Sequence, residues 1–292
     1  MRKQFVKTTE KIFKKNKKSI LLLGDIGVFG FRNLLKYYPD RSKNIGVLEQ
    51  STISFAAGLA LMGFTPIVHT IAPFLISRAF EQLKIDFGYQ KLRGKFVTTG
   101  SSYDYSTMGC THHCAEDINL MTSIPNMQII IPGSSEEFNK IFTQTFKSKN
   151  PMYFRLSDYE NKNSHKVKFG KLNLLRKGSK ATIIAVGPVM NCLDDIFKFD
   201  VNIIYLTTIR PLDIVAIKKI NKNIDKFLLI EPYFSSNLNN ELNNIFRKKI
   251  SIKNISIPYK FLTNYGNKKQ HDSALGFTKK NIEKELQKLL RI

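Results

Sequence analysis

The stretch Gly46-Val-Leu-Glu49-Gln-Ser51 and the segment Phe55-Ala-Ala-Gly-Leu-Ala60 after it decide the interpretation of this sequence. They place a carboxylate between a short apolar strand, predicted over residues 44–48, and an apolar, small-residue helix, predicted over 50–62. We expect Glu49 to be at least partly buried there. Burial disfavours the charged form of a carboxyl group, which suits a group that shares a proton with a weakly basic nitrogen. The alternative is a glutamate that satisfies backbone donors at a helix start.

Strand-like and helix-like segments alternate around this stretch. Buried strands separated by helices indicate a parallel α/β sheet with helices on both faces. The further strands are predicted over 20–24, 66–70, 95–99, 127–131 and 152–155, and the helices over 74–87, 115–122 and 136–147.

A polar stretch over residues 158–180, rich in Lys, Asn, Ser and Gly, is typical of a linker and is expected to contain a hairpin. A second, smaller α/β series follows it. Its strands are predicted over 181–187, 202–206, 227–231 and 252–257, and its closing helix over 279–290. We therefore predict two α/β domains, residues 1–165 and 175–292, with a boundary near residue 170.

The charge balance is extreme, because 46 Lys and Arg against 23 Asp and Glu give a formal net charge of +23 over 292 residues. Nucleic-acid or membrane-surface binding is one interpretation. The lysines occur along the whole chain, however, and no nucleic-acid-binding module accompanies them. We therefore favour lysine-rich solvated faces and predict no specific nucleic-acid partner, while an anionic substrate or an acidic partner stays compatible.

Neither membrane insertion nor secretion is expected. No stretch reaches about 18 apolar residues, and the basic N-terminal segment lacks a long apolar core followed by a small-residue cleavage site. The odd number of cysteines argues against a disulfide scaffold and for a reducing compartment. The default location is cytoplasmic.

Two of the three cysteines raise the question of a zinc site. Cys110 and Cys114 flank His112 and His113, so four potential ligands fall within five residues. Structural zinc sites generally draw pairs of ligands from separate segments. We therefore predict no metal site in this chain.

Three more motifs follow Glu49-Gln50 along the chain. They are Phe74 with Arg78-Ala-Phe-Glu-Gln82, Gly109-Cys-Thr-His112-His113 with Glu116-Asp117, and Ile124-Pro-Asn-Met127. In order and spacing the four motifs resemble the pyrimidine-binding region of transketolases, in particular the C-terminal subunit of split, two-chain transketolases. The resemblance covers residues 20–157 well and continues more weakly through 208–213 and 230–232.

The resemblance implies roles for single residues. Glu49 would hydrogen-bond N1′ of the aminopyrimidine of thiamine diphosphate, and Phe74 would pack on that ring, unless it is an ordinary core aromatic. Asp25 resembles the family aspartate near the cofactor and the substrate channel, with a turn-capping role as the alternative. His112 resembles the histidine that moves protons at substrate hydroxyls, whereas its neighbour His113 is a second substrate residue or is only structural.

Arg155 is the remaining substrate residue that the resemblance implies, and around it the sequence departs from the family. Asp158 stands where many members have an arginine, Gly100-Ser-Ser where many have a histidine, and Met108-Gly109 where Asp-Gly is usual. In the family these groups hold a substrate phosphate or contact a donor hydroxyl. We therefore expect a substrate other than an ordinary phosphoketose, such as a nucleotide-linked or otherwise modified sugar, or a phosphate held by other cations.

The diphosphate half of the cofactor site is missing from the sequence. Gly24-Asp25-Ile26 is not the Gly-Asp-Gly motif of thiamine enzymes, and no other candidate exists. Mg²⁺ bridging phosphates needs such oxygen ligands. The chain is therefore expected to act only with an N-terminal transketolase subunit that carries the diphosphate and Mg²⁺ site, in a two-fold symmetric α2β2 assembly.

The expected reaction is transfer of a two-carbon ketol unit from a ketose to an aldose. One alternative is the β subunit of a 2-oxo-acid dehydrogenase decarboxylating component, which also pairs with a separate diphosphate-binding chain. The Arg-Ala-Phe-Glu-Gln and Thr-His-His segments favour transketolase over it, and a deoxyxylulose-phosphate-synthase-like role is disfavoured because that enzyme normally keeps both halves in one chain. Retention of Glu49, Phe74 and His112 disfavours a non-catalytic basic binding protein on the same fold.

Overall fold

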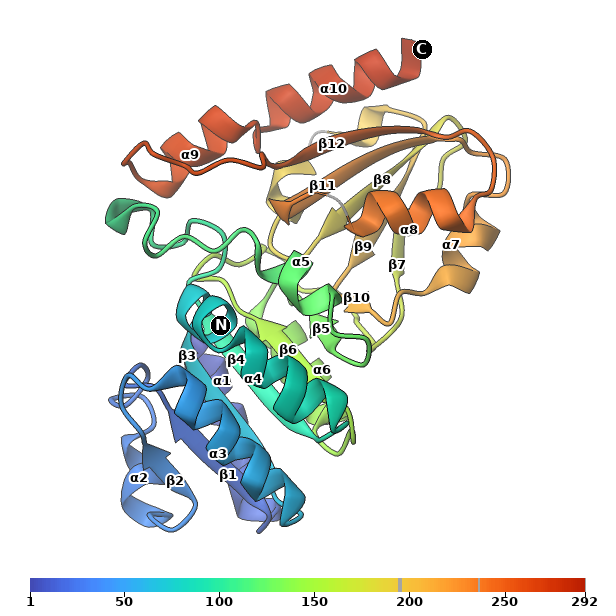
Figure 1. The fold of residues 1–292 in the computed structure, drawn as a ribbon. Coiled ribbons are helices and arrows are strands. Elements are labelled where there is room, and N and C mark those ends of the chain that lie inside the picture. The colour runs from blue at the N-terminus through green and yellow to red at the C-terminus, as the bar shows by residue number, and fades with distance from the viewer. Residues whose placement is uncertain (194–195, 236, 292) are drawn as a thin grey trace.

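Two β-sheets organise the computed structural model, which describes residues 1–193, 196–235 and 237–291 (Figure 1). The first sheet has seven strands in the order β10-β5-β6-β4-β3-β1-β2. Its strands are β1 (Ser19–Leu23), β2 (Ser42–Asn44), β3 (Thr65–Ile71), β4 (Gly94–Thr99), β5 (Gln128–Ile130), β6 (Pro151–Arg155) and β10 (Thr208–Arg210). All neighbours pair in parallel except β10, which runs antiparallel to β5.

Helices cover both faces of the first sheet, so its central strands are buried throughout, as a parallel sheet requires. On one face α1 (Arg2–Lys15) lies against α6 (Ser135–Thr145), and their phenylalanines pack on Leu21, Leu23 and Val97. The other face carries α3 (Glu49–Leu61) and a helical stretch made of η1 (Phe74–Arg78), α4 (Phe80–Gln82) and η2 (Leu83–Tyr89), of which η1 and η2 are π-helical. The remaining helices here are α2 (Arg32–Tyr37), η3 (Ser106–Met108) and α5 (Asp117–Thr122).

The second sheet has five strands in the order β12-β11-β8-β9-β7. They are β7 (Asn173–Arg176), β8 (Ala181–Val186), β9 (Val201–Leu206), β11 (Lys226–Phe234) and β12 (Ser251–Ile257). Its helices are η4 (Met190–Leu193), η5 (Ile196–Lys198), α7 (Ile214–Ile220), α8 (Asn237–Ile245), α9 (Lys268–Leu275) and α10 (Lys279–Arg291). The apolar side chains of α8 join a core cluster that continues into the first sheet, so one hydrophobic core connects both sheets.

The predicted fold class is confirmed, and two local expectations, the strand over 44–48 and the hairpin within 158–180, are corrected. No element was predicted for the basic segment before residue 18, which forms the helix α1 with Phe5, Ile12 and Phe13 on its buried face. The strand expected over 44–48 ends at Asn44, because Gly46 takes a positive φ of 84° that turns the chain into α3.

The second correction, and a strand that was not predicted, both concern strand pairing after the first sheet. No hairpin forms within residues 158–180, because β7 pairs with β9 at the edge of the second sheet. β10 lies beyond the linker in sequence but belongs to the first sheet. The division into residues 1–165 and 175–292 stays a prediction.

Within the part of the chain that is described, no helix has both the length and the apolar composition that crossing a bilayer requires.

Candidate active site

The residues singled out from the sequence lie in loops and helix starts that follow the carboxyl ends of parallel strands. Such ends meet at one edge of a sheet, which is where open α/β folds place their ligand sites. Asp25 follows β1, Glu49 begins α3 after β2, Phe74 follows β3, and the loop that contains His112 follows β4. The topology therefore brings these segments together.

Glu49 is the first residue of α3, and its carboxylate is only 4% exposed, so the predicted burial is confirmed. Its charged partner is Arg78, whose Nη1 donates to Oε1 at 3.3 Å and to Oε2 at 3.4 Å. The positive end of the helix dipole lies at the same place and favours a negative side chain. Glu49 is thus a buried carboxylate held by one arginine and a helix N-terminus.

Phe74 connects Glu49's partner to the histidine loop. The Arg78 guanidinium lies over the half-buried Phe74 ring, with Cζ 4.1 Å from the ring centroid. The His112 ring meets Phe74 edge-on at 5.3 Å between centroids. Glu49, Arg78, Phe74 and His112 therefore form one continuous cluster, which we call the pyrimidine cluster.

Sequence reasoning included Arg78 within a motif but assigned it no role. Arg78 is the last residue of the π-helical η1, four residues after Phe74 and 29 residues after Glu49, and it contacts both. The sequence signal for the contact with Phe74 is the spacing, because Arg78 follows Phe74 by about one helical turn and a guanidinium can stack on an aromatic ring.

The two adjacent histidines point to different surroundings. His112 shares a hydrogen bond between Nδ1 and the Thr111 hydroxyl, at 3.0 Å. His113 instead contacts the ring of His271 in α9, with centroids 5.6 Å apart. Burial lowers the pKa of His113, and its neighbours His271 and His112 lower it further. This placement supports the structural alternative for His113.

A cavity of about 570 Å³ lies beside His113, between the histidine loop and the second sheet. Cys110 and His113 line it from the histidine loop, and Phe234, Tyr259 and Phe261 line it from β11 and the coil after β12. The cavity wall is mostly apolar and aromatic. Its polar groups come from the segment between β4 and α5, which also carries His112, and from Lys260 in the coil after β12.

Asp25 occupies a turn after β1 with a positive φ of 64°. Its exposed carboxylate accepts a hydrogen bond from Asn44 Nδ2 at 3.2 Å, and its backbone N–H donates to Asn44 Oδ1 at 2.9 Å. Asp tolerates the left-handed region better than most residues. These bonds hold the turn between β1 and β2 and support the turn-capping alternative.

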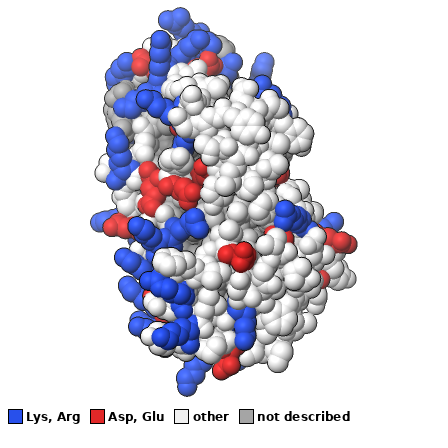
Figure 2. Space-filling model, turned by 90° about the vertical axis from the view of Figure 1, so that its left-hand side faces the viewer, with Lys and Arg blue, Asp and Glu red and all other residues white. Residues whose placement is uncertain are grey.

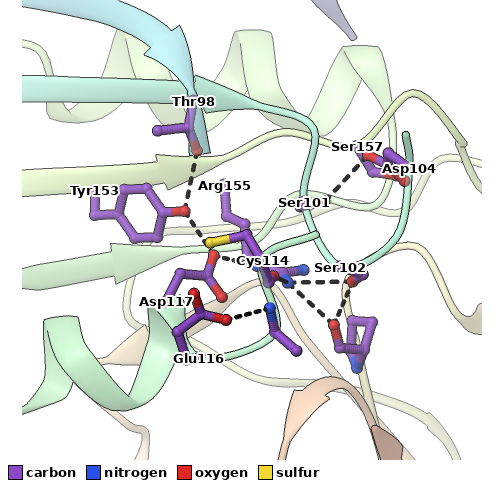
Figure 3. Close-up of polar contacts among 12 residues, drawn as sticks. Thr98, Ser101, Ser102, Asp104, Cys114, Glu116, Asp117, Tyr153, Arg155 and Ser157 are labelled. Carbon is purple, nitrogen blue, oxygen red and sulfur yellow. Dashed lines mark hydrogen bonds and ion pairs between the residues drawn. The ribbon is translucent and has the colours of Figure 1, made fainter. Parts of the chain in front are cut away.

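Arg155 lies in the interior rather than at an open surface (Figure 3). Its Nε donates to Asp117 Oδ2 at 2.6 Å, and the same oxygen accepts from the Tyr153 hydroxyl at 2.6 Å. Nη2 lies 3.1 Å from each of three further oxygens, which are Ser102 Oγ and the carbonyls of Cys114 and Pro232. This placement argues against the expected substrate contact, because the guanidinium is enclosed by protein groups.

Asp158, which stands where the family pattern has an arginine, lies close to the buried carboxylate of Asp104. Asp104 accepts from the Ser157 hydroxyl at 2.9 Å and from the backbone N–H of Asp158 at 3.0 Å. Burial raises the pKa of Asp104 to about 6, and the nearby charge of Asp158 acts in the same direction. Asp104 was not found from the sequence, because no motif contains it.

The charge distribution is uneven on the face shown in Figure 2. Lys and Arg side chains lie on the upper and the lower part of this face, and a group of Asp and Glu side chains lies in a hollow between them. A broad area without charged side chains lies next to that group. Among the described residues, no group of three or more His, Cys, Asp or Glu side chains is arranged to hold a metal ion. The cysteines of the histidine loop differ, since Cys110 is exposed and Cys114 is buried.

Comparison with known proteins identifies the arrangement. Residues 1–161 match the family described as "Transketolase, pyrimidine binding domain". The chain belongs to the transketolase family. The matched residues include the whole pyrimidine cluster, so the geometry and the family assignment concern the same part of the molecule.

Individual relatives match along much of the chain. One of the subunits of an apulose-4-phosphate transketolase from Actinobacillus succinogenes is 34% identical over 209 residues, which cover 68% of this chain and 67% of that protein. An "Uncharacterized 33.6 kDa protein in fasciation locus" from Rhodococcoides fascians is 29% identical over 291 residues, covering 94% and 89%. The expected resemblance to the C-terminal chain of split transketolases is therefore confirmed.

A solved structure agrees with this transketolase fold over nearly the full length. A split gene transketolase, described as an inactive beta4 tetramer, has a TM-score of 0.86 at 21% sequence identity. The match covers 99% of this chain and 97% of that one. Both sheets therefore belong to the transketolase fold, the second as well as the first.

Proposed function

We propose that this chain is the pyrimidine-binding subunit of a thiamine-diphosphate-dependent transketolase. The enzyme would transfer a two-carbon ketol unit from a ketose to an aldose, and only together with a separate N-terminal subunit. The observation that carries the proposal is the buried Glu49 carboxylate, which lies in one cluster with the Phe74 ring and His112. A carboxylate beside an aromatic face suits a flat, nitrogen-containing ring.

The described residues fit one half of thiamine diphosphate. Glu49 would share a proton with the pyrimidine ring nitrogen N1′, and Phe74 would pack on that ring. The cofactor supplies, when bound, the nucleophilic carbon and the electron sink that two-carbon transfer requires. The remaining half does not fit, because the sequence has no Gly-Asp-Gly motif and the described residues form no cluster of metal ligands.

A partner is therefore part of the proposal. An N-terminal transketolase subunit would contribute the diphosphate and Mg²⁺ site, and we propose an α2β2 assembly with two-fold symmetry. Exposed apolar side chains support such a contact, because surface patches of this kind commonly mark protein interfaces. They include Leu48, Phe55, Met108, Tyr259, Phe261 and Tyr265.

His112 would exchange protons with substrate hydroxyls. Its Nδ1 is engaged with Thr111, which leaves Nε2 as the atom for this exchange. The edge-on contact with Phe74 fixes the ring next to the proposed cofactor position. Histidine is the side chain most often used for such proton transfer.

The part of the sugar substrate that lies near Asp104 and Asp158 would carry no phosphate group. The charge of Asp158 acts on Asp104, whose carboxylate also accepts from the Asp158 backbone N–H, and two negative charges there would repel a phosphate. This supports a modified or nucleotide-linked sugar rather than an ordinary phosphoketose. The alternative, a 2-oxo-acid dehydrogenase β subunit, shares the cofactor half but is not favoured by the match to transketolase subunits.

Isothermal titration of thiamine diphosphate with Mg²⁺ tests the proposal. The cofactor is titrated into the isolated chain, and then into the chain mixed with an N-terminal subunit that contains Gly-Asp-Gly. We expect tight binding only in the mixture, weakened about tenfold or more by Glu49→Ala. Glu136→Ala is the matched control, because Glu136 is an exposed acidic residue in the first turn of α6.

Two results would contradict the proposal. Tight Mg²⁺-dependent binding to the isolated chain would show that the diphosphate site does not require a partner. Equal binding by Glu49→Ala and by the Glu136 control would remove Glu49 from the cofactor site.

A further inference from the structure

Arg78 makes the same two contacts that the proposed function assigns to the aminopyrimidine ring. Its Nη1 donates to both carboxylate oxygens of Glu49, at 3.3 and 3.4 Å. Its guanidinium also lies over Phe74, with Cζ 4.1 Å from the centroid. A guanidinium is flat, rich in N–H donors and able to stack on an aromatic face, as an aminopyrimidine is. The two groups therefore compete for one carboxylate and one ring.

We propose that Arg78 gates the pyrimidine site, so that its guanidinium must leave Glu49 and Phe74 before the cofactor's pyrimidine ring takes its place. The inference rests on the proposed function and adds a residue that controls it. Arg78 is a positioning residue in this scheme, since it acts on cofactor access and not on the reacting atoms.

The contacts of Arg78 are suited to being broken. Charge-assisted hydrogen bonds between N–H and carboxylate groups are commonly about 2.7–2.9 Å long, so both bonds to Glu49 are longer than usual. The Arg78 side chain is 46% exposed, which gives the guanidinium a direct path to solvent. Arg78 is also the last residue of η1, and π-helical turns frequently occur at functional sites.

The same contacts have a stabilising role while they last. The Glu49 side chain is only 4% exposed, and an ionised carboxylate left buried without a partner is strongly unfavourable. Arg78 supplies that partner from within the same chain. When the pyrimidine ring binds, it replaces one partner of Glu49 by another, so the carboxylate need not lose its hydrogen bonds in the exchange.

The test measures cofactor binding in the mixture of both subunits. Arg78→Met keeps the length of the side chain but removes the guanidinium, and Arg78→Lys keeps the charge but removes the planar group. Arg247→Met is the control, because Arg247 is exposed and follows α8, away from the pyrimidine cluster. Titration calorimetry gives Kd for thiamine diphosphate with Mg²⁺, and stopped-flow fluorescence gives its association rate.

We expect Arg78→Met to lower Kd at least threefold and to raise the association rate, with Arg78→Lys between it and the unchanged chain. Arg247→Met should bind as the unchanged chain does. Unchanged or weaker binding by Arg78→Met would overturn the gate while leaving the proposed function intact. Failure of the unchanged mixture to bind the cofactor would overturn both.

A measurement on the isolated chain checks the ion pair without cofactor. Arg78→Met should lower Tm when Glu49 is present and should have little effect in a Glu49→Gln background. An equal change of Tm in the two backgrounds would show that Arg78 is not paired with Glu49 in solution, which also overturns the gate.

Discussion

Lys95 is a fully buried cation at the amino end of β4, on the opposite edge of the sheet from the pyrimidine cluster. Its Nζ lies 3.0 Å from the Met152 sulfur and 3.5 Å from the Ser148 carbonyl oxygen. Neither partner carries a charge. Burial, and to a lesser extent the charge of Arg93, lower the pKa of Lys95 to about 7.

This lysine makes stability depend on pH. The pKa in the folded chain lies below the ordinary value of 10.5, so between about pH 7 and 10.5 the unfolded chain binds more protons. The free energy of unfolding therefore rises with pH over this window. As the pH falls from 10.5 to about 7, the contribution of neutral Lys95 to the free energy of unfolding is lost.

We predict that Lys95→Met raises the free energy of unfolding at pH 7 by about 1–3 kcal/mol, because it removes a buried polar group without a strong partner. The gain should shrink as pH approaches 10. Urea denaturation at pH 7 and pH 9.5 measures both effects, with exposed Lys43→Met as the control. A gain equal at both pH values would disprove the lowered pKa.

The residues of the pyrimidine cluster were partly predictable from sequence for a specific reason. Glu49, Phe74 and His112 each follow a strand of a parallel sheet. Since the carboxyl ends of parallel strands lie at one edge of the sheet, the sequence predicts that these three residues lie near one another. The interior position of Arg155 was not predictable in this way. It depends on Asp117 and Pro232, which lie 38 and 77 residues away in the sequence.

At the level of elements, α1 shows how composition can conceal a helix. Its lysines dominate the segment, but Phe5, Ile12 and Phe13 line one buried face against the first sheet. Phe5 is 1% exposed and meets the rings of Phe31 and Phe138 at 5.0 and 5.8 Å. The apolar face is present in the sequence, but lysines dominate the composition of the segment and no helix was predicted there.

We predict that Phe5→Ala lowers the free energy of unfolding by about 3–5 kcal/mol, because it leaves a cavity between α1 and α6. Phe29→Ala is the matched control, since Phe29 is 81% exposed and should change stability little. Chemical denaturation followed by circular dichroism compares the two. Similar small losses for both variants would mean that α1 does not pack on the sheet in solution.

Strand β10 was missed for a different physical reason. It has three residues, which is too short for an alternating pattern, and its partner β5 lies almost 80 residues earlier. Short strands of this kind are set by tertiary pairing and not by local propensity. The longer buried strands of both sheets were predicted well, because their apolar runs are continuous.

For the whole molecule, Arg155 joins segments that are far apart in sequence. It binds Asp117 at the start of α5, the loop around Ser102, and the Pro232 carbonyl in β11 of the second sheet (Figure 3). The backbone N–H of Phe234 also donates to the Ala115 carbonyl at 2.9 Å. The histidine loop is therefore fixed from both sheets at once.

We predict that Arg155→Met lowers the free energy of unfolding by about 3–5 kcal/mol, because Asp117 is left buried without its cation. The double variant Arg155→Met/Asp117→Leu should recover a large part of that loss, since a buried ion pair can be replaced by apolar residues. Urea denaturation of both variants measures the recovery. A double variant at least as unstable as Arg155→Met would contradict this account.

The pairing of β10 with β5 also determines what happens when the chain is cut at the linker or when its C-terminal half is exchanged. A cut in the linker near residue 170 would leave β5 as an open sheet edge, and exposed edges promote pairing with other chains and aggregation. A fragment of the first sheet alone should therefore be prone to self-association. For the same reason, a chimaera that exchanges the C-terminal half must bring along a strand that pairs with β5.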